Sequence, residues 1–384
     1  MIIYNNLRAQ RCNQGRYMKK LKKNILLLIT ALLLVTAAII WIIDAPSRKT
    51  KAFLASYEIT DLTALGFRNV RAINDKGQAL GTDNQNRTCI WDEQNGLTIL
   101  NIPQEAGYSA TAFNNSGQIA GFFYKPSGEK HVFIWDANNG LIHLGTLGGR
   151  NSFVNAMNDS GQVIGHSEDP NGRLHPFFWD PNTGMTDLSL FTNNQDRITH
   201  ALDIDNAGRV VGSASDGSTT YAIIWDKETG FVRLPTPNDA SGVAYNISPD
   251  GKVAGCLEDN TNLIIWDSPN NCRVLAALRR NARHRPMNIN DAGQIVGWAS
   301  QRGILSSRSS AFFWSNETGF IVLEELGKSR GKLKLPKLPW LTSSESRFLA
   351  ALDINNKGQI LKVTAPHSGQ YPAILMTPKK APKE

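Results

Sequence analysis

An all-β fold, in which seven four-stranded antiparallel sheets form a closed ring, is predicted by three observations in this 384-residue sequence. A segment of roughly 44 residues is repeated seven times, every copy carries a hairpin turn that ends in glycine, and the first predicted strand completes the last copy. Four short strands in a repeat of this length are typical of one blade of a β-propeller. The sequence therefore predicts a seven-bladed β-propeller.

Two motifs define the repeat. One is a turn of the type Asn-Asp-x-Gly, in which Asn or Asp starts the turn and glycine takes the positive φ that closes it. The other is an FxWD strand, apolar at nearly every residue, as expected for a strand that is covered on both faces. The turn glycines are Gly77, Gly117, Gly161, Gly208, Gly251, Gly293 and Gly358. The tryptophans are Trp91, Trp135, Trp179, Trp225, Trp266 and Trp314, with Met376 in the seventh copy, and we expect them to pack between blades.

The ends of the repeat region indicate how the ring closes. The segment Tyr57–Leu62 (YEITDL) matches the fourth strand of other copies, such as Gly184–Leu188, whereas Ala373–Thr377 matches the third strand of the seventh copy. We therefore expect the N-terminal strand to complete the last blade, which would leave no exposed sheet edge at the junction. The alternative is six closed blades with a distorted seventh copy.

The charge distribution argues against a nucleic-acid partner. The formal net charge is +8, but residues 1–50 alone hold nine Lys and Arg and one acidic residue, Asp44, so the rest of the chain is neutral. A protein that binds phosphate backbones needs a basic surface on its folded domain. No nucleic-acid binding is expected.

The N-terminal residues predict a membrane anchor. Ile25–Ile43 is nineteen uncharged residues long, about 28 Å as a helix, and seven Lys and Arg precede it without an acidic residue. The positive-inside rule places the N-terminus in the cytoplasm and exports the rest, so a bacterial protein of this kind would sit in the inner membrane with the propeller on the periplasmic or extracellular side. The alternative is a secreted protein released by signal cleavage, with translation from Met1 or Met18.

The predicted organisation has five parts. They are a cytoplasmic basic tail (1–23), a transmembrane anchor or uncleaved signal (24–44), a linker (45–56), the propeller (57–378) and a basic C-terminal tail (379–384).

The second and third copies carry a family resemblance. Residues 131–165, HVFIWDANNGLIHLGTLGGRNSFVNAMNDSGQVIG, resemble the repeat of the bacterial HAF extracellular repeat family. The histidine of that motif is kept at His131 and His175. Other residues replace it in the remaining copies: Arg87, Tyr221, Asn262, Ser310 and Pro372. The resemblance implies export from a bacterial cell and a propeller-like fold, and it implies no known reaction.

One candidate site follows from the residue two positions before each turn. This residue is alanine in the first three copies, but polar in the last four: Asp203, Asn246, Asn288 and Asp353. If the first strand of each blade is innermost, these four side chains lie on one side of the central channel. The hypothesis is that they coordinate a cation or hold water there. The alternative is that they cap their own turns.

A second candidate site is a basic rim formed by two connections between blades. The connection between Leu323 and Asn355 is unusually long and contains the sequence GKSRGKLKLPKLPW, and the preceding connection is rich in arginine. Both connections join a fourth strand to a first strand, so we expect them on the same rim. The predicted rim residues are Arg279, Arg280, Arg283, Arg285, Lys328, Arg330, Lys332, Lys334 and Lys337. An acidic partner such as anionic lipid, acidic polysaccharide or an acidic protein face would suit this charge.

Catalytic motifs and a cofactor site are not found in the sequence. It contains no GxSxG, HExxH, P-loop, CxxC or GxGxxG after a predicted strand. We therefore expect a non-enzymatic, cofactor-free binding module displayed outside the cytoplasm. The alternative is an exported propeller enzyme, similar to a glycosidase or lyase, that acts on an extracellular polymer through paired carboxylates.

Overall fold

The structure is a computed structural model of the chain, and it contains two compact units, Met1–Phe53 and Leu54–Glu384. The residues that it describes are 48–103, 107–191, 196–257, 261–275, 282–301, 308–323, 348–365 and 372–379.

The predicted anchor (24–44) and basic tail (1–23) lie outside the described residues. In the described part of the chain, no helix combines the length and the apolar character that a membrane span requires. Residues 48–55 are helical, although the sequence analysis assigns them to a linker. This helix is short and precedes the first strand, so the all-β assignment of the repeat region stands.

Seven antiparallel sheets of four strands make up the second unit. The first strands of blades 1 to 7 are β2 (Phe67–Ile73), β6 (Ser109–Phe113), β10 (Ser152–Met157), β14 (Arg197–Ile204), β18 (Gly242–Ile247), β22 (Ala282–Ile289) and β26 (Phe348–Ile354). The second strands are β3 (Ala79–Asp83), β7 (Ile119–Tyr124), β11 (Val163–Glu168), β15 (Val210–Ser215), β19 (Val253–Leu257), β23 (Ile295–Gln301) and β27 (Ile360–Ala365).

The third strands include the FxWD motif or its variants, and in every blade but the second the fourth strand is the shortest or equal shortest. The third strands are β4 (Thr88–Asp92), β8 (Lys130–Asp136), β12 (Leu174–Asp180), β16 (Thr220–Asp226), β20 (Leu263–Ser268), β24 (Arg308–Ser315) and β28 (Ala373–Pro378). The fourth strands are β5 (Gly96–Ile99), β9 (Gly140–Gly145), β13 (Gly184–Asp187), β17 (Gly230–Arg233), β21 (Asn271–Val274), β25 (Gly319–Val322) and, in blade 7, β1 (Tyr57–Asp61). Two single 3₁₀ turns, η1 (Leu188–Leu190) and η2 (Pro237–Asp239), follow β13 and β17.

The ring closes as the sequence predicts. The N-terminal strand β1 pairs antiparallel with β28, from Tyr57 opposite Pro378 to Asp61 opposite Ile374, and thereby completes the sheet β1-β28-β27-β26. The hydrogen bond from the Leu62 N–H to the Ala373 carbonyl (3.1 Å) extends the pairing by one residue. Seven closed blades are therefore confirmed.

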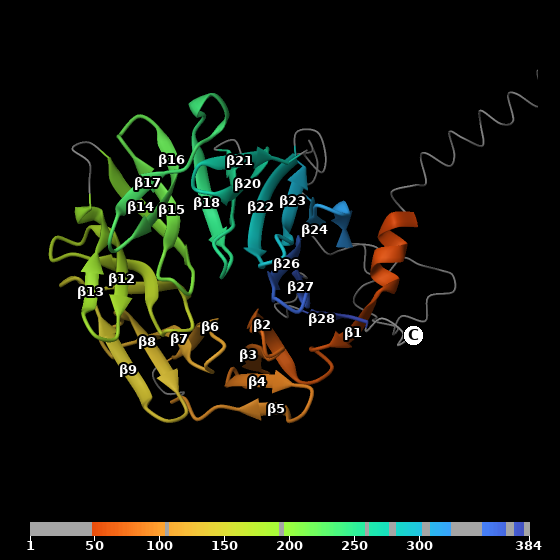
Figure 1. Cartoon of the computed structure of the whole chain (residues 1–384). Coiled ribbons are helices and arrows are strands. Elements are labelled where there is room, and N and C mark those ends of the chain that lie inside the picture. Colours follow the sequence, from red (N-terminus) through yellow and green to blue (C-terminus); the bar gives the residue numbers. More distant parts are fainter. Residues whose placement is uncertain are drawn as a thin grey trace, which may run out of the picture. The chain divides into compact units, whose positions relative to one another are not determined.

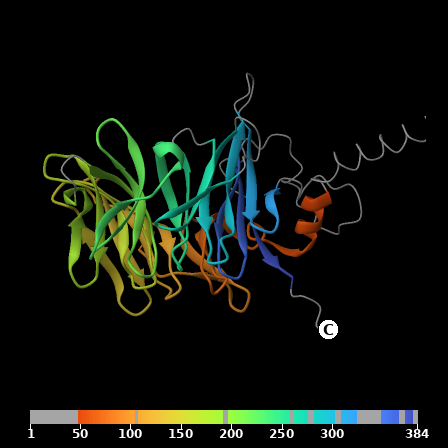
Figure 2. The same ribbon diagram turned by 45° about the horizontal axis from the view of Figure 1, so that its top comes forward.

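The first strand of each blade is innermost. Each first strand contacts the first strands of both neighbouring blades, and the circle is completed by the contact between β26 and β2. Figures 1 and 2 show the blades arranged around a common axis, with β2 near the centre and β5 at the periphery. Because the start of β3 pairs with the end of β4, the turns after the first and third strands of a blade share one face. We call this the turn face and the opposite side the loop face.

Two glycines of the repeat have a structural role: the turn glycine and the glycine four residues after it. All seven turn glycines have a positive φ, from 70° at Gly293 to 97° at Gly251, as the turn chemistry requires. The glycine four residues later lies opposite a bulge in the first strand, where a Cβ atom on Gly165 would come within 1.9 Å of the Phe153 carbonyl oxygen. In blade 7 this second position is Lys362, whose side chain is buried.

The tryptophan row packs between blades, as predicted. Trp225 of blade 4 packs against Phe178 of blade 3, and Trp266 of blade 5 packs against Ile224 of blade 4. These two indoles are 2% and 0% exposed, whereas Trp91 is partly exposed, as is its equivalent in blade 3. Each blade therefore buries the apolar side chains of its neighbour, and no blade has a complete core by itself.

We predict that β1 is required for a closed monomer. Deletion of residues 1–62 removes the strand that covers the edge of β28 and the buried side chains of Tyr57 and Leu62, so we expect a loss of about 3 kcal/mol or more in the free energy of unfolding, with self-association through the exposed edge. Denaturant unfolding and gel filtration measure both effects.

The matched control is deletion of residues 1–53, which ends at the boundary of the second unit and keeps β1. A deletion of 1–62 that is as stable and as monomeric as this control would contradict the closure.

Candidate functional site at the central mouth

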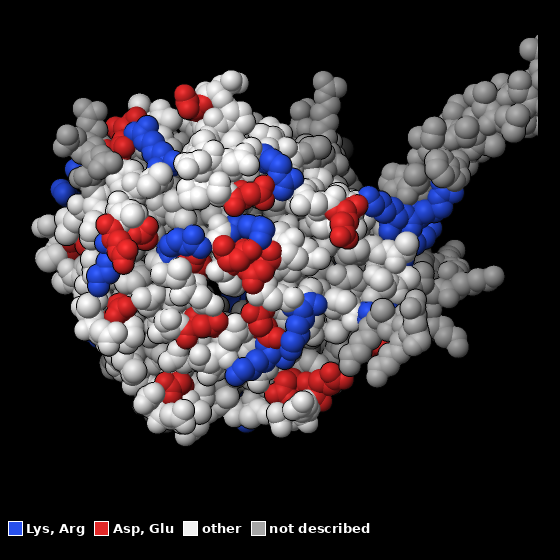
Figure 3. All heavy atoms as spheres, in the orientation of Figure 1, with Lys and Arg blue, Asp and Glu red and all other residues white. Residues whose placement is uncertain are grey.

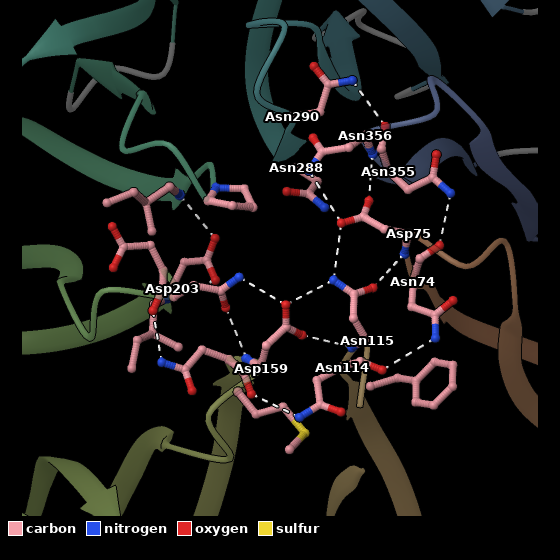
Figure 4. Close-up of a pocket in the computed structure, with 18 of the residues that line it drawn as sticks. Asn74, Asp75, Asn114, Asn115, Asp159, Asp203, Asn288, Asn290, Asn355 and Asn356 are labelled. Atoms are coloured by element: carbon pink, nitrogen blue, oxygen red, sulfur yellow. Dashed lines mark hydrogen bonds between the residues drawn. The ribbon is translucent and has the colours of Figure 1, made fainter. Parts of the chain in front are cut away.

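The seven turns between first and second strands surround a small cavity at the centre of the turn face. The second residue of these turns is Asp75, Asn115, Asp159, Asn206, Pro249, Asp291 and Asn356, and we call this set the turn ring. The cavity, here called the central mouth, has a volume of about 150 Å³ and is lined by turn residues of all seven blades. Figure 4 shows the labelled asparagine and aspartate side chains pointing toward one another around it.

Hydrogen bonds run around the turn ring from blade to blade. The N–H of Asp75 donates to Oδ1 of Asn115 (2.7 Å), and the N–H of Asn115 donates to Oδ1 of Asp159 (2.7 Å). The same contact joins Asp159 to Asn206 (3.0 Å) and closes the circle across the blade 7–blade 1 junction, where the N–H of Asn356 donates to Oδ1 of Asp75 (2.7 Å). The mouth is therefore a rigid, preorganised set of polar groups (Figure 4).

Pro249 interrupts this circle between blades 4 and 5. Proline has no N–H to donate, and its side chain offers no oxygen to the N–H of Asn206. The next residue, Asp250, replaces it on one side, because its N–H donates to Oδ1 of Asp291 (2.8 Å). The junction of blades 4 and 5 is thus the one place where the described turn ring lacks its blade-to-blade contact.

A second layer of contacts supports the ring from behind. Where a turn begins with asparagine, its amide donates to the first turn carbonyl of the next blade, as from Asn114 to Asn158 (2.9 Å) and from Asn355 to Asn74 (2.8 Å). The same amide also donates to Oε1 of the glutamine four residues later, for example Gln118 (2.9 Å).

In blades 4 and 5 the first turn residue is not asparagine, and the residue four positions later is not glutamine. Asp205 begins the turn of blade 4, and its carboxylate accepts from Nε of Arg209 (2.6 Å), which stands where five of the other six blades have glutamine. Ser248 begins the turn of blade 5, and Lys252 occupies the glutamine position and donates to the carbonyl of Asp291 (2.7 Å). The two positions therefore change together, and each new cation is paired with a carboxylate of its own turn: Arg209 with Asp205, and Lys252 with Asp250.

The sequence interpretation missed the turn ring. It treated the second turn residue only as part of a turn, whereas this residue links neighbouring blades. Two signals in the sequence point to it: the restriction of this position to Asp and Asn in six of seven copies, and the pairing of Asn with Gln, Asp with Arg and Ser with Lys across five residues.

The four predicted channel residues lie just behind the ring, and each one bonds to backbone. Asp203 accepts from the N–H of Ile204 (2.9 Å) and, across the blade interface, from that of Ile247 (3.0 Å). Asp353 accepts in the same way from Ile354 (2.9 Å) and from Ile73 of blade 1 (2.8 Å). Both carboxylates therefore brace neighbouring blades.

The two predicted amides are held in the same region. Asn288 donates to the carboxylate of Asp353 and accepts from the N–H of Ile289 (2.7 Å). Asn246 donates to the carbonyl of Met287 (2.9 Å), while its buried Oδ1 has no hydrogen-bond partner among the described residues. Among those residues, no group of three His, Cys, Asp or Glu side chains is arranged to hold a metal ion. A cation or ordered water here stays a prediction.

Burial at the centre of the ring shifts the acidity of these carboxyl groups. Removal from water raises the pKa of Asp203 to about 7, and the negative charge of Asp353 contributes further. Burial also raises the pKa of Asp353 to about 6, and that of Asp291 in the turn ring above its usual value. Figure 3 shows acidic side chains around the central hollow of the turn face. The mouth is therefore an acidic, partly protonated site near neutral pH.

The size of the mouth limits its chemistry. A volume of about 150 Å³ is smaller than the ~300–1,000 Å³ of pockets that hold small organic ligands, although it has room for a few water molecules. A glycosidase would need two carboxyl groups beside a bound sugar ring. The mouth brings together Asp203 and Asp353 with raised pKa values but offers an ion or water a better fit than a sugar.

The predicted basic rim is described only at Arg283 and Arg285. Both are exposed, and both lie in β22, the innermost strand of blade 6, which corrects the expectation that they belong to a loop. The Arg285 guanidinium lies over the Tyr245 ring, 5.0 Å from its centroid. The other rim residues, namely Arg279, Arg280, Lys328, Arg330, Lys332, Lys334 and Lys337, lie outside the described residues.

The two motif histidines are separate from the mouth. His131 is buried at the start of β8. His175 lies in an exposed region of β12, where its Nδ1 is 2.6 Å from the Ser189 hydroxyl and 3.0 Å from the Asp187 carboxylate. The two side chains have different surroundings, so the structure does not bring them together as a pair.

Comparison with known proteins finds only distant structural similarity. No family model and no curated protein sequence matches the chain. Similar solved structures include a streptogramin B lyase (11% identity, TM-score 0.47, covering 83% of this chain and 97% of that one). A catalytically inactive virginiamycin B lyase from Staphylococcus aureus with quinupristin is 10% identical, with a TM-score of 0.48, and the match covers 84% of this chain and 99% of that one. YCF48 bound to D1 peptide is 9% identical, with a TM-score of 0.46, covering 85% and 97%. At such identities the ligands of those proteins carry no information about this chain.

We predict that the turn ring stabilises the propeller. Asn115→Ala removes the acceptor for the Asp75 N–H and the amide that donates to Asp159 (2.9 Å), so the free energy of unfolding should fall by about 1–3 kcal/mol in denaturant titrations. Pro249→Ala is the matched control, because it changes the same ring position where no such contact exists, and its effect should stay below about 1 kcal/mol. Equal effects of the two substitutions would contradict the role of the ring.

We also predict a pH dependence from the two buried carboxyl groups. Because their pKa values are higher in the folded than in the unfolded protein, the folded state binds protons more tightly, and their contribution to stability is lost as the pH rises from about 4 to about 7. Between pH 4.5 and 8 the wild type should lose about 3 kcal/mol more than the Asp203→Ala/Asp353→Ala variant, measured by denaturant unfolding.

The control is Asp180→Ala, which removes a carboxyl group whose pKa is lowered by its hydrogen bond from Gln162. The Asp180 carboxyl takes up its proton only below about pH 4. The change in the free energy of unfolding between pH 4.5 and 8 should therefore be the same in this variant as in the wild type. A double variant that retains the wild-type pH dependence would disprove the assignment.

Proposed function

We propose that the chain is an exported, membrane-anchored β-propeller of the HAF repeat type that binds an acidic polysaccharide through its loop face. The seven-bladed fold supports this, because it offers a rigid scaffold on which the connections between blades present binding residues. The resemblance of residues 131–165 to the HAF repeat supports export from a bacterial cell.

The observation that most directly supports this proposal is the place where the chain enters the propeller. β1 begins at Tyr57, opposite the end of β28, and the end of β28 lies on the turn face. A predicted anchor at residues 24–44 is joined to this point by only about a dozen residues. An anchored chain would therefore enter the propeller at its turn face, opposite the loop face.

This polarity selects among the acidic partners. Arg283 and Arg285 are in the first half of β22, which is its loop-face end, because the strand runs from there toward the turn at Asn290. The rim connections that lie outside the described residues join strand ends on that same face. A basic surface on the face opposite the chain entry suits an extended acidic polysaccharide of the envelope.

The described end of this surface has the features of a binding site. Among the described residues, no carboxylate forms an ion pair with Arg283 or Arg285, so both charges are available to a ligand. The stacking of Arg285 on Tyr245 orders the guanidinium and leaves its N–H groups free to donate to a carboxylate. Arginine on a rigid strand is preorganised for such contacts.

We predict that reversal of these charges weakens binding to a polyanion. The full chain in detergent, carrying Arg283→Glu and Arg285→Glu, should bind polygalacturonate at least tenfold more weakly than the wild type in calorimetry, with a smaller dependence on salt.

The control is Lys227→Glu, which reverses the charge of an exposed side chain in the turn after β16, on the turn face. It should bind polygalacturonate like the wild type. Unchanged binding by the arginine variant would refute the proposal, and stronger binding to vesicles that contain phosphatidylglycerol than to polygalacturonate would favour a lipid partner instead.

A further inference from the structure

A second, larger cavity lies where the ring closes. This closure groove has a volume of about 740 Å³, within the ~300–1,000 Å³ of pockets that hold small ligands, and it lies on the turn face between blades 7 and 1. One wall comes from β1 and the turn of blade 7, including Glu58 and Lys357, and the other comes from the two turns of blade 1, including Lys76 and Glu93.

Closure itself explains why a groove forms here. In blades 1 to 6 the third and fourth strands are joined by a tight turn on the turn face, as at residues 92–95 in blade 1. Blade 7 has no such turn, because its fourth strand β1 comes from the other end of the unit. The neighbouring Trp91 packs against blade 7 and is partly exposed, as is Trp179 of blade 3, whereas Trp225 and Trp266 are buried.

The groove combines an indole ring with polar groups that have no other role. Trp91 lines it, and its indole N–H forms no hydrogen bond with other described residues. The side chains of Glu93 and Gln94 are exposed in the adjacent turn and likewise form no hydrogen bond with described residues. Two lysines and the acidic side chains of Glu58, Asp92 and Glu93 nearly balance in charge, so the groove does not select an ion.

We propose that the closure groove binds a neutral oligosaccharide. Sugar hydroxyl groups both donate and accept, which matches a wall that mixes carboxylates, an amide and ammonium groups. The apolar C–H face of a sugar ring packs on an aromatic ring, as Trp91 offers, while the indole N–H can donate to a hydroxyl. A groove without a dominant charge favours an uncharged ligand over the polyanion assigned to the loop face.

The test uses the full chain in detergent and an array of neutral and anionic oligosaccharides, followed by calorimetry with the neutral sugars that bind. We expect a neutral oligosaccharide to bind with a dissociation constant of about 1 mM or tighter. Glu93→Ala with Gln94→Ala should weaken this binding at least tenfold without changing stability, since both side chains are exposed. Trp91→Leu should weaken it further.

The matched control is Lys227→Ala with Glu228→Ala, the same two positions in the corresponding turn of blade 4. There the N–H of Glu228 donates to Asp226 (2.8 Å), as that of Gln94 donates to Asp92 (3.0 Å). This control should bind the sugar like the wild type. The proposal is overturned if no neutral oligosaccharide binds at millimolar concentration, or if the Glu93/Gln94 variant binds as tightly as the control.

Discussion

The pairing of β1 with β28 is the constraint on which the rest of the structure depends. A blade has its apolar side chains on faces that only neighbouring blades cover, so an open row of seven would expose two flanks and one sheet edge. Pairing across more than 300 residues removes both problems. The junction of blades 7 and 1 then repeats contacts found elsewhere in the ring, because Asp353 accepts from Ile73 as Asp203 does from Ile247, and Asn356 bonds to Asp75 as Asn115 does to Asp159.

On the turn face, the hydrogen bonds that link neighbouring blades also bring acidic side chains close together. Its inner turns are linked by short hydrogen bonds between Asp or Asn side chains and the next backbone N–H, which places several carboxyl groups in a small volume. Burial raises the pKa of Asp203 and Asp353 because water is excluded, and the negative charges of Asp353 and Asp75 respectively add to these shifts. The interruption at Pro249 and the paired changes at Asp205 and Arg209 fall in neighbouring blades, so the ring is least uniform at the junction of blades 4 and 5.

Three surfaces of the propeller therefore differ in chemistry. The central mouth is small and acidic, the loop face carries exposed arginines on β22, and the closure groove is larger and nearly neutral. The first and third lie on the face where the chain enters from its N-terminal segment, whereas the second lies opposite.

The sequence by itself determined the number of blades, their closure and the role of the turn glycines. These features depend on the number of repeats and on local backbone chemistry, and the same motif recurs in every repeat. The sequence also identified Asp203 and Asp353 as polar residues at a position that is alanine in the first three blades. Only the tertiary structure decided what these carboxylates contact, since Ile247 and Ile73 come from other blades. The same holds for the turn ring, for the strand position of Arg283 and Arg285, and for the closure groove: each depends on neighbours that are distant in sequence and adjacent only once the ring has closed.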